Sequence, residues 1–138
     1  MSEHDEPEVD LAAALGASVA TSTQILTLYV PNKDRDGREF GTQRRWVLEA
    51  ASLLAEMGGG VTVMPPCEGG WWNEGTRTLV WEAPVVVYTY IKPDAFVREL
   101  PRLRALLHRL GRETNQGEVG VEFDGRFYRI NTFESGGP

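Results

Sequence analysis

The order of secondary-structure signals along this chain constrains its fold more than any other feature. Two segments repeat apolar residues at helical spacing, and five segments have the β-branched and aromatic content of strands. Proline, glycine runs and an Asp-Gly dipeptide separate these segments. Between residues 24 and 130 the order is therefore β-α-β-β-α-β, followed by one extra strand.

Each element has its own boundary signals. The first helix begins after Thr42 as N-cap and ends at the three glycines 58–60, whereas the second begins at Asp94 and contains Pro101, which predicts a kink or a break. The dipeptide Asp124-Gly125 is typical of a two-residue hairpin turn. The predicted strands are Gln24–Pro31, Val61–Pro65, Arg77–Ile91 (with a bulge or an unpaired position at Pro84), Glu118–Phe123 and Arg126–Ile130.

This element order resembles the ferredoxin-like split βαβ arrangement. The resemblance implies an α+β fold, with two helices on one face of an antiparallel sheet and an extra C-terminal hairpin strand. It covers residues 24–130 and depends on element order alone. Outside that domain we expect an acidic flexible tail over residues 1–23, with one helical turn at Val9–Leu15, and a second flexible tail over residues 131–138.

Length and composition place the chain among soluble single-domain proteins. Its 138 residues suffice for one hydrophobic core, and no apolar run is long enough to span a bilayer. The one cysteine, Cys67, excludes an intrachain disulfide and favours a cytoplasmic location. No secretory signal and no cofactor motif is visible, so we predict neither a membrane nor a cofactor as partner.

The acidity of the chain belongs to its N-terminus. Five acids and no Lys or Arg in residues 1–10 account for all but one of the six net negative charges. The predicted domain is therefore almost neutral, which disfavours general nucleic-acid binding without excluding it.

The predicted topology brings three loops to one end of the domain, namely residues 32–41, 66–76 and 111–117. These loops are longer than those at the opposite end and contain charged and aromatic residues that folding does not require. We therefore predict a ligand or partner site at this end, formed by Trp71, Trp72, Asn73, Glu74, Arg35, Arg38, Glu113 and Gln116.

The adjacent indoles of Trp71 and Trp72 are the most unusual part of this site. Neighbours in an extended segment point to opposite faces, so one indole can enter the core while the other faces outward. Closing the core edge, packing against a second copy and lining a ligand pocket all remain open at this stage.

The segment Arg77–Ile91 is apolar on both of its faces. An antiparallel sheet with one wet face alternates apolar with polar residues, so the face without helices needs a cover. We predict a homodimer through this face, formed by Val86, Tyr88 and Tyr90. The alternative is that the N-terminal segment or the final strand lies across it.

The loop that starts at Asn32 resembles the beginning of a calcium loop, with Asp34 and Asp36 as weak candidate metal ligands. The match ends at its twelfth position, where Gln43 replaces the required Glu, and basic residues offset the acids. An Asx turn explains the same residues, so we predict no metal site.

No catalytic motif accompanies these features, and whether the protein is an enzyme stays open, with a non-enzymatic role favoured. The main expectation is a binding or accessory module, homodimeric, that binds a partner or small ligand through the three loops. The alternative is a small enzyme with a pocket between those loops, acting on a phosphate-bearing or small organic substrate. A third is single-stranded nucleic-acid binding, with Trp71 and Trp72 as stacking surfaces.

Overall fold

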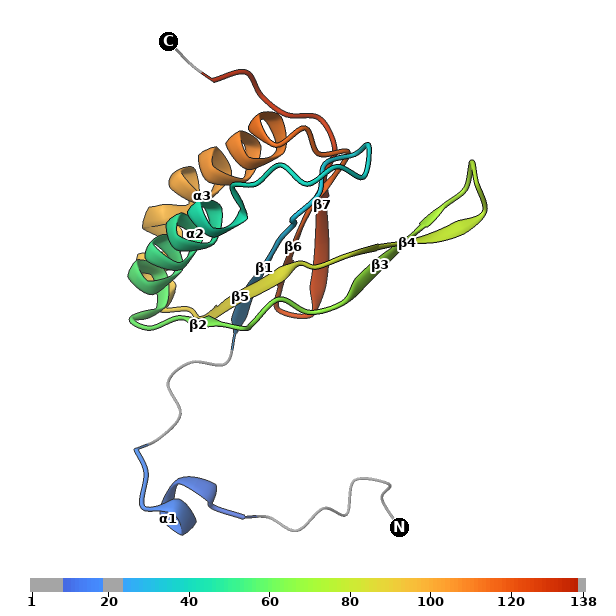
Figure 1. Cartoon of the computed structure of the whole chain (residues 1–138). Coiled ribbons are helices and arrows are strands. Elements are labelled where there is room, and N and C mark those ends of the chain that lie inside the picture. The colour runs from blue at the N-terminus through green and yellow to red at the C-terminus, as the bar shows by residue number, and fades with distance from the viewer. Residues whose placement is uncertain (1–8, 19–23, 137–138) are drawn as a thin grey trace.

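The computed structural model describes residues 9–18 and 24–136, and all structural statements below refer to these ranges. Figure 1 shows two long helices packed on one side of a sheet, from which a two-stranded hairpin extends. No helix in these ranges combines the length and the apolar character that crossing a membrane requires. The elements are α1 (Leu11–Leu15), β1 (Ile25–Val30), α2 (Gln43–Gly58), β2 (Thr62–Val63), β3 (Gly69–Asn73), β4 (Thr78–Glu82), β5 (Val85–Tyr90), α3 (Pro93–Glu113), β6 (Val119–Phe123) and β7 (Arg126–Ile130).

The main sheet has five strands in the order β2-β5-β1-β6-β7, and every neighbouring pair is antiparallel. The central strand β1 pairs with β5 along its whole length, from Ile25 opposite Tyr90 to Val30 opposite Val85. The prediction of an α+β protein with an antiparallel sheet is confirmed. The strands β3 and β4 form a separate two-stranded sheet.

Strict alternation along the strands builds one hydrophobic core between the sheet and the helices α2 and α3. Leu26, Leu28 and Val30 of β1 are buried, whereas the residues between them are not. From α2 the core receives Trp46, Val47 and Leu54 at helical spacing. Burial of such side chains is the main stabilising term, at about 1.5–3 kcal/mol for each large apolar residue.

The predicted strand Arg77–Ile91 is wrong as one element. It is divided at Ala83 and Pro84 into β4 and β5, which belong to different sheets. Proline has no N–H to donate to a ladder, so the chain changes sheets where the pairing must stop. The predicted loop 66–76 is partly wrong too, because Gly69–Asn73 pairs with Thr78–Glu82 as β3.

Helix α3 differs from its predicted form at two positions. It starts at Pro93 with Lys92 as the N-cap residue, so Asp94 lies in the first turn and is not the cap. The helix continues through Pro101 as one element. Pro101 and Val97 are both exposed, and water can therefore bond the carbonyl that the proline leaves free. The short helix α1 lies where a helical turn was predicted and buries none of its residues.

The segment after β7 lies against α3. The Phe133 ring occupies the space beside Gly111, where an added Cβ would lie 2.0 Å from a ring carbon. The Glu134 N–H donates to Nδ1 of His108 at 2.9 Å, and Arg104 forms an ion pair with the Glu134 carboxylate. Gly111 is therefore required by packing, because no side chain fits between the helix and the ring.

We expect Gly111→Ala to lower the free energy of unfolding by about 1–3 kcal/mol, the usual effect of overpacking. The loss should occur although alanine is a better helix former than glycine by about 1 kcal/mol. Urea unfolding of the full chain measures it. Gly60→Ala is the matched control, because a Cβ there meets nothing within 4 Å. In the Phe133→Ala background the effect of Gly111→Ala should disappear, and its persistence would contradict this account.

Candidate functional site

The hairpin of β3 and β4, residues 69–82, extends from the body of the protein, and we call it the arm (Figure 1). Its register places Trp71 opposite Val80 and Trp72 opposite Leu79. Side chains therefore alternate between two arm faces: one carries Trp71, Val80 and Glu82, and the other carries Trp72, Leu79 and Trp81. The two neighbouring indoles lie in different environments.

A pocket of about 380 Å³ lies between the first of these faces and the body. The body contributes one wall from the loop after β1 and another from the turn before β6. The arm contributes the indole of Trp71 and the carboxyl of Glu82. The residues that line the pocket are Asp34, Arg35, Trp71, Glu82, Gln116, Gly117 and Glu118.

Hydrogen bonds fix the two body walls to one another. The Gln116 side-chain amide donates to the Lys33 carbonyl at 2.9 Å, and the Arg35 guanidinium donates to the Gln116 carbonyl at 2.8 Å. The Arg35 backbone N–H donates to the Asn115 carbonyl at 2.9 Å. Gln116 is 7% exposed, so its side of these bonds is shielded from water, and together the bonds link the two walls.

Glu82 is the carboxyl in the pocket whose protonation is altered by its surroundings. Partial burial raises the pKa of the Glu82 carboxyl above its usual value, while the positive charge of Lys33 acts in the opposite direction. Glu118, which also lines the pocket, has a carboxylate oxygen 4.0 Å from Nε of Arg129 and is more exposed than Glu82. A titratable group with a perturbed pKa in a pocket is a candidate for proton transfer or for binding a cation.

The resemblance of residues 32–37 to a calcium loop has a structural explanation. One carboxylate oxygen of Asp34 accepts the backbone N–H groups of Asp36 and Arg38, at 2.9 and 3.0 Å. The Asp34 carboxylate therefore closes an Asx-type turn and stabilises the loop. Within the described ranges, no three His, Cys, Asp or Glu side chains gather where they could hold a metal ion.

Three of the predicted site residues, Trp71, Arg35 and Gln116, line the pocket together. The others lie elsewhere. Trp72 is 52% exposed on the opposite arm face, and Asn73 and Glu74 form the arm tip, where the Asn73 side chain accepts two backbone N–H groups. Arg38 is exposed, and Glu113 faces Arg45 and Arg109 at the end of α3.

Sequence reasoning missed Glu82 and Glu118 as site residues. Both were assigned to predicted strands, and attention went to the loops instead. A signal for Glu82 was present, because it is the one acid in the apolar run from Leu79 to Tyr88 and it lies two residues before a proline. A lone carboxyl in such a run marks a point where the strand leaves the core.

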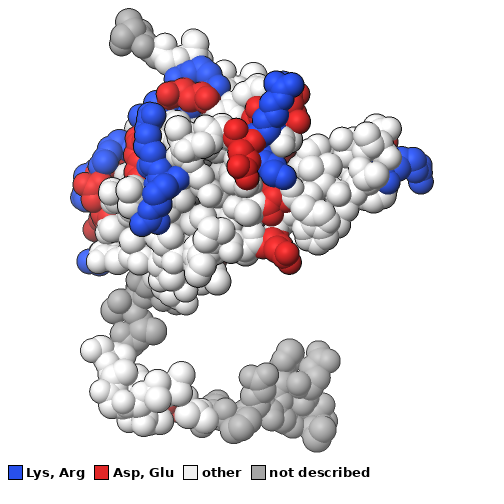
Figure 2. Space-filling model, in the orientation of Figure 1, with Lys and Arg blue, Asp and Glu red and all other residues white. Residues whose placement is uncertain are grey.

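Charge is distributed unevenly over the surface. Figure 2 shows Lys, Arg, Asp and Glu side chains intermixed over the helices, whereas the arm is almost uncharged apart from its tip. Arg77 lies at that tip, far along the arm from the pocket, while Arg112 bonds the Glu134 carbonyl at the C-terminal segment.

The sheet face without helices carries the residues predicted for an interface. Val86 and Tyr88 are half-buried and Tyr90 is 50% exposed, as expected for the outer side of β5. On the same face the Tyr29 hydroxyl donates to the Glu122 carboxylate. This hydrogen bond, together with burial, raises the pKa of Tyr29 to about 12.

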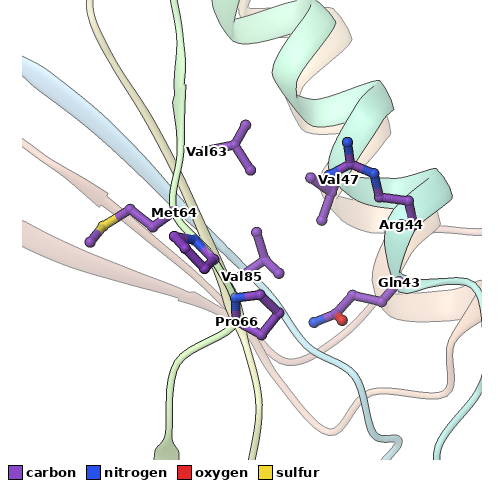
Figure 3. Close-up of a pocket in the computed structure, with 8 residues that line it drawn as sticks. Gln43, Arg44, Val47, Val63, Met64, Pro66 and Val85 are labelled. Atoms are coloured by element: carbon purple, nitrogen blue, oxygen red, sulfur yellow. The ribbon is translucent and has the colours of Figure 1, made fainter.

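A second hollow, of about 450 Å³, lies between the start of α2 and the segment after β2 (Figure 3). Its walls are mostly aliphatic side chains and prolines, with Arg44 as the one charged lining residue. It contains no acid and no nucleophile, so the pocket at the arm remains the stronger candidate for chemistry.

Comparison with known proteins shows a likeness in fold alone. No protein-family model and no curated protein sequence matches the chain. A phage SAM lyase in complex with S-methyl-5'-thioadenosine has a TM-score of 0.56 and 13% identity, over 83% of this chain and 94% of the lyase. The phage SAM lyase in its apo state has a TM-score of 0.59 and 15% identity, over 86% of this chain and 97% of the lyase.

These structures contradict the expectation of a non-enzymatic binding or accessory module. Both are structures of an enzyme, and the alternative of a small enzyme with a pocket between the loops agrees with them better. The expectation was wrong because it depended on the lack of a catalytic motif. A carboxyl made reactive by its surroundings leaves no such motif in the sequence.

The raised pKa of Glu82 predicts a specific pH dependence. A carboxyl whose pKa is higher in the folded state contributes stability at low pH, and this contribution is lost as the pH rises through the folded-state pKa. Carbon-13 NMR of the side-chain carboxyls should therefore show Glu82 titrating above 4.5, the ordinary glutamate value. Relative to wild type, Glu82→Gln should become more stable as the pH rises above that value. A Glu82 titration midpoint at or below 4.5 would contradict the account.

Proposed function

We propose that this protein is a lyase-type enzyme that binds a sulfonium or thioether nucleoside of the S-adenosylmethionine class in the pocket between arm and body. The observation that supports this most is the composition of the pocket, in which the Trp71 indole and the Glu82 and Glu118 carboxyls face a walled cavity. The likeness in fold to a phage SAM lyase adds a precedent for such a ligand on this scaffold.

The pocket chemistry suits a ligand with a positive charge beside an aromatic base. A cation is attracted to the face of an indole, by up to about 2 kcal/mol when water is excluded. Three acids line the same pocket, Asp34, Glu82 and Glu118, and their carboxylates add electrostatic attraction, which is strengthened by partial burial. The adenine ring would stack on apolar surface, while the loop that contains Arg35 and Gln116 supplies polar groups for selection.

A lyase reaction on a sulfonium needs no water and no second substrate. The carbon–sulfur bond breaks, its electron pair goes to sulfur, and a neutral thioether nucleoside leaves. The other fragment is left electron-deficient at the carbon of the broken bond. It becomes stable either by losing a proton to a base or by forming a ring with its own carboxylate. In either case the Glu82 carboxylate would stabilise the cation, and in the route that loses a proton its raised pKa favours it as the proton acceptor.

The test is to incubate the 138-residue chain with S-adenosylmethionine and to measure the release of S-methyl-5'-thioadenosine by mass spectrometry. We expect wild type to release this product and Trp71→Phe to lose at least about tenfold in kcat/KM, because 1.4 kcal/mol of lost binding is a factor of ten. Trp72→Phe is the matched control, since this indole points away from the pocket and its loss should leave turnover unchanged.

Product formation by wild type at the level of a heat-denatured sample would refute the lyase proposal. Equal losses of kcat/KM in Trp71→Phe and Trp72→Phe would contradict the assignment of the reaction to the pocket that Trp71 lines. Intrinsic fluorescence titrated with S-methyl-5'-thioadenosine separates binding from turnover. Quenching should disappear in Trp71→Phe and persist in Trp72→Phe.

We also propose that the sheet and helices form a ferredoxin-like core, which the antiparallel order β2-β5-β1-β6 supports. We propose self-association through the open sheet face, supported by the exposure of Tyr90 and Phe127 there. Light scattering of wild type and of Tyr88→Glu tests it: a monomeric variant and an oligomeric wild type are expected. A cytoplasmic location is proposed from the single cysteine.

A further inference from the structure

A short connection joins the arm to the main sheet, and the proposed function assigns no role to the residues that hold it in place. Two residues, Ala83 and Pro84, join β4 of the arm to β5 of the main sheet. The arm forms no ladder with the main sheet, so its orientation is set by what holds this connection and the second one, residues 64–68, where the Cys67 N–H donates to the Pro84 carbonyl at 3.0 Å. Trp71 and Glu82 belong to the arm, while the other pocket walls belong to the body, and the width of the pocket therefore depends on that orientation.

Three polar side chains from the body hold the connection. The Ala83 N–H donates to the side-chain oxygen of Asn32 at 2.8 Å, and the Gln43 amide donates to the Ala83 carbonyl at 2.9 Å. The same Gln43 nitrogen donates to the Val30 carbonyl at 3.1 Å, which ties the connection to the end of β1. The Lys33 ammonium donates to the Trp81 carbonyl at 3.1 Å.

These bonds act on both sides of one residue. The Trp81 carbonyl belongs to the peptide group before Glu82, and the Ala83 N–H belongs to the peptide group after it. When both flanking peptide groups are held, the backbone angles of Glu82 are held as well, and its Cβ can point in only one direction. Lys33 and Asn32 thus direct the carboxyl into the pocket, while Gln43 anchors the assembly to the core.

The bonds are not needed merely to satisfy the backbone. Ala83 and Asn32 are only half-buried, so water could replace either partner at little cost. A water molecule would satisfy the peptide groups but would not fix their position relative to α2 and β1. The specific gain from the side chains is orientation.

We propose that Asn32 and Gln43 are positioning residues that set the angle of the arm and thereby place Glu82 and Trp71 against the body. The proposal deepens the proposed function of the same pocket and rests on it for the ligand. It also gives a role to the segment that resembles a calcium loop: Asn32 and Gln43, its first and twelfth positions, both bind the arm connection.

The arm angle can be measured without any ligand. Nitroxide labels at Glu74→Cys on the arm tip and Arg98→Cys on α3, in a Cys67→Ser background, report the arm-to-body distance by pulsed electron resonance. We expect one narrow distance distribution in the otherwise unchanged chain and a clearly broader one in Asn32→Ala and Gln43→Ala. Asn32→Asp should keep the narrow distribution, because a carboxylate oxygen still accepts the Ala83 N–H.

The same variants are then titrated with S-methyl-5'-thioadenosine. Asn32→Ala and Gln43→Ala should each bind about tenfold more weakly, a loss of about 1.4 kcal/mol, and Asn32→Asp should bind like wild type. Unchanged distance distributions in both alanine variants would overturn the proposal, as would broadened distributions with unchanged affinity. If wild type does not bind this nucleoside, the proposed function fails, and the distance measurement alone decides whether these residues set the arm.

Discussion

The hydrogen bonding of Ala83 at the junction of arm and sheet is the interaction on which the site depends. Pro84 has no N–H, so the ladder that would continue from β5 into β4 must stop there. The chain is then free to leave the main sheet, and its peptide groups at the junction become available to other partners. Asn32 and Gln43 bond to Ala83 from the body and so fix the position of the junction. The segment Arg77–Ile91 is thereby divided into β4, which forms part of the arm, and β5, which forms part of the main sheet.

Separation of the arm from the sheet explains the electrostatics of the pocket. A carboxyl within β5 would have faced either the core or the open sheet face. On β4, at the base of the arm, Glu82 is partly shielded by the body on one side and still reaches the cavity on the other. Burial raises its pKa, and Lys33 limits the rise by its positive charge. Placement on the arm therefore keeps a partly buried acid in contact with solvent and with the cavity.

The sequence predicted those parts of the fold that depend on periodicity. The helical spacing in Gln43–Gly58 comes from burial on one side, which leaves a regular pattern, and the β-branched and aromatic residues of Ile25–Val30 and Val85–Tyr90 indicate strands. The strand β3 left none, because Gly69-Gly70 and Asn73 are typical turn residues. Its pairing depends on contacts with β4 that no local pattern reveals. The glycines serve the base of the arm, where a Cβ on Gly69 would lie 3.0 Å from Pro84.

The candidate site was also partly predictable from the sequence, through the topology of the fold. Loop convergence follows from topology, and Trp71, Arg35 and Gln116 do share one pocket. The choice between Trp71 and Trp72 depends on register, which fixes the face of every arm residue at once. Sequence shows that the two indoles point apart but not which of them faces the body. Glu82 faces the pocket for the same reason as Trp71, because the register places both side chains on the same face of the arm.

The arm also carries a physical problem that its attachment solves only in part. An isolated two-stranded hairpin is at best marginally stable in water. This one leaves Trp72, Leu79 and Trp81 exposed on the face away from the pocket, at 52%, 45% and 58%. The bonds at Ala83 fix its base, and the Asn73 side chain organises its tip. Neither covers the outward indoles, so the arm is the element of this fold that gains most from further contacts. A ligand against Trp71 would stabilise one face and a second protein surface the other, and the alternation of a β-strand keeps these two effects independent.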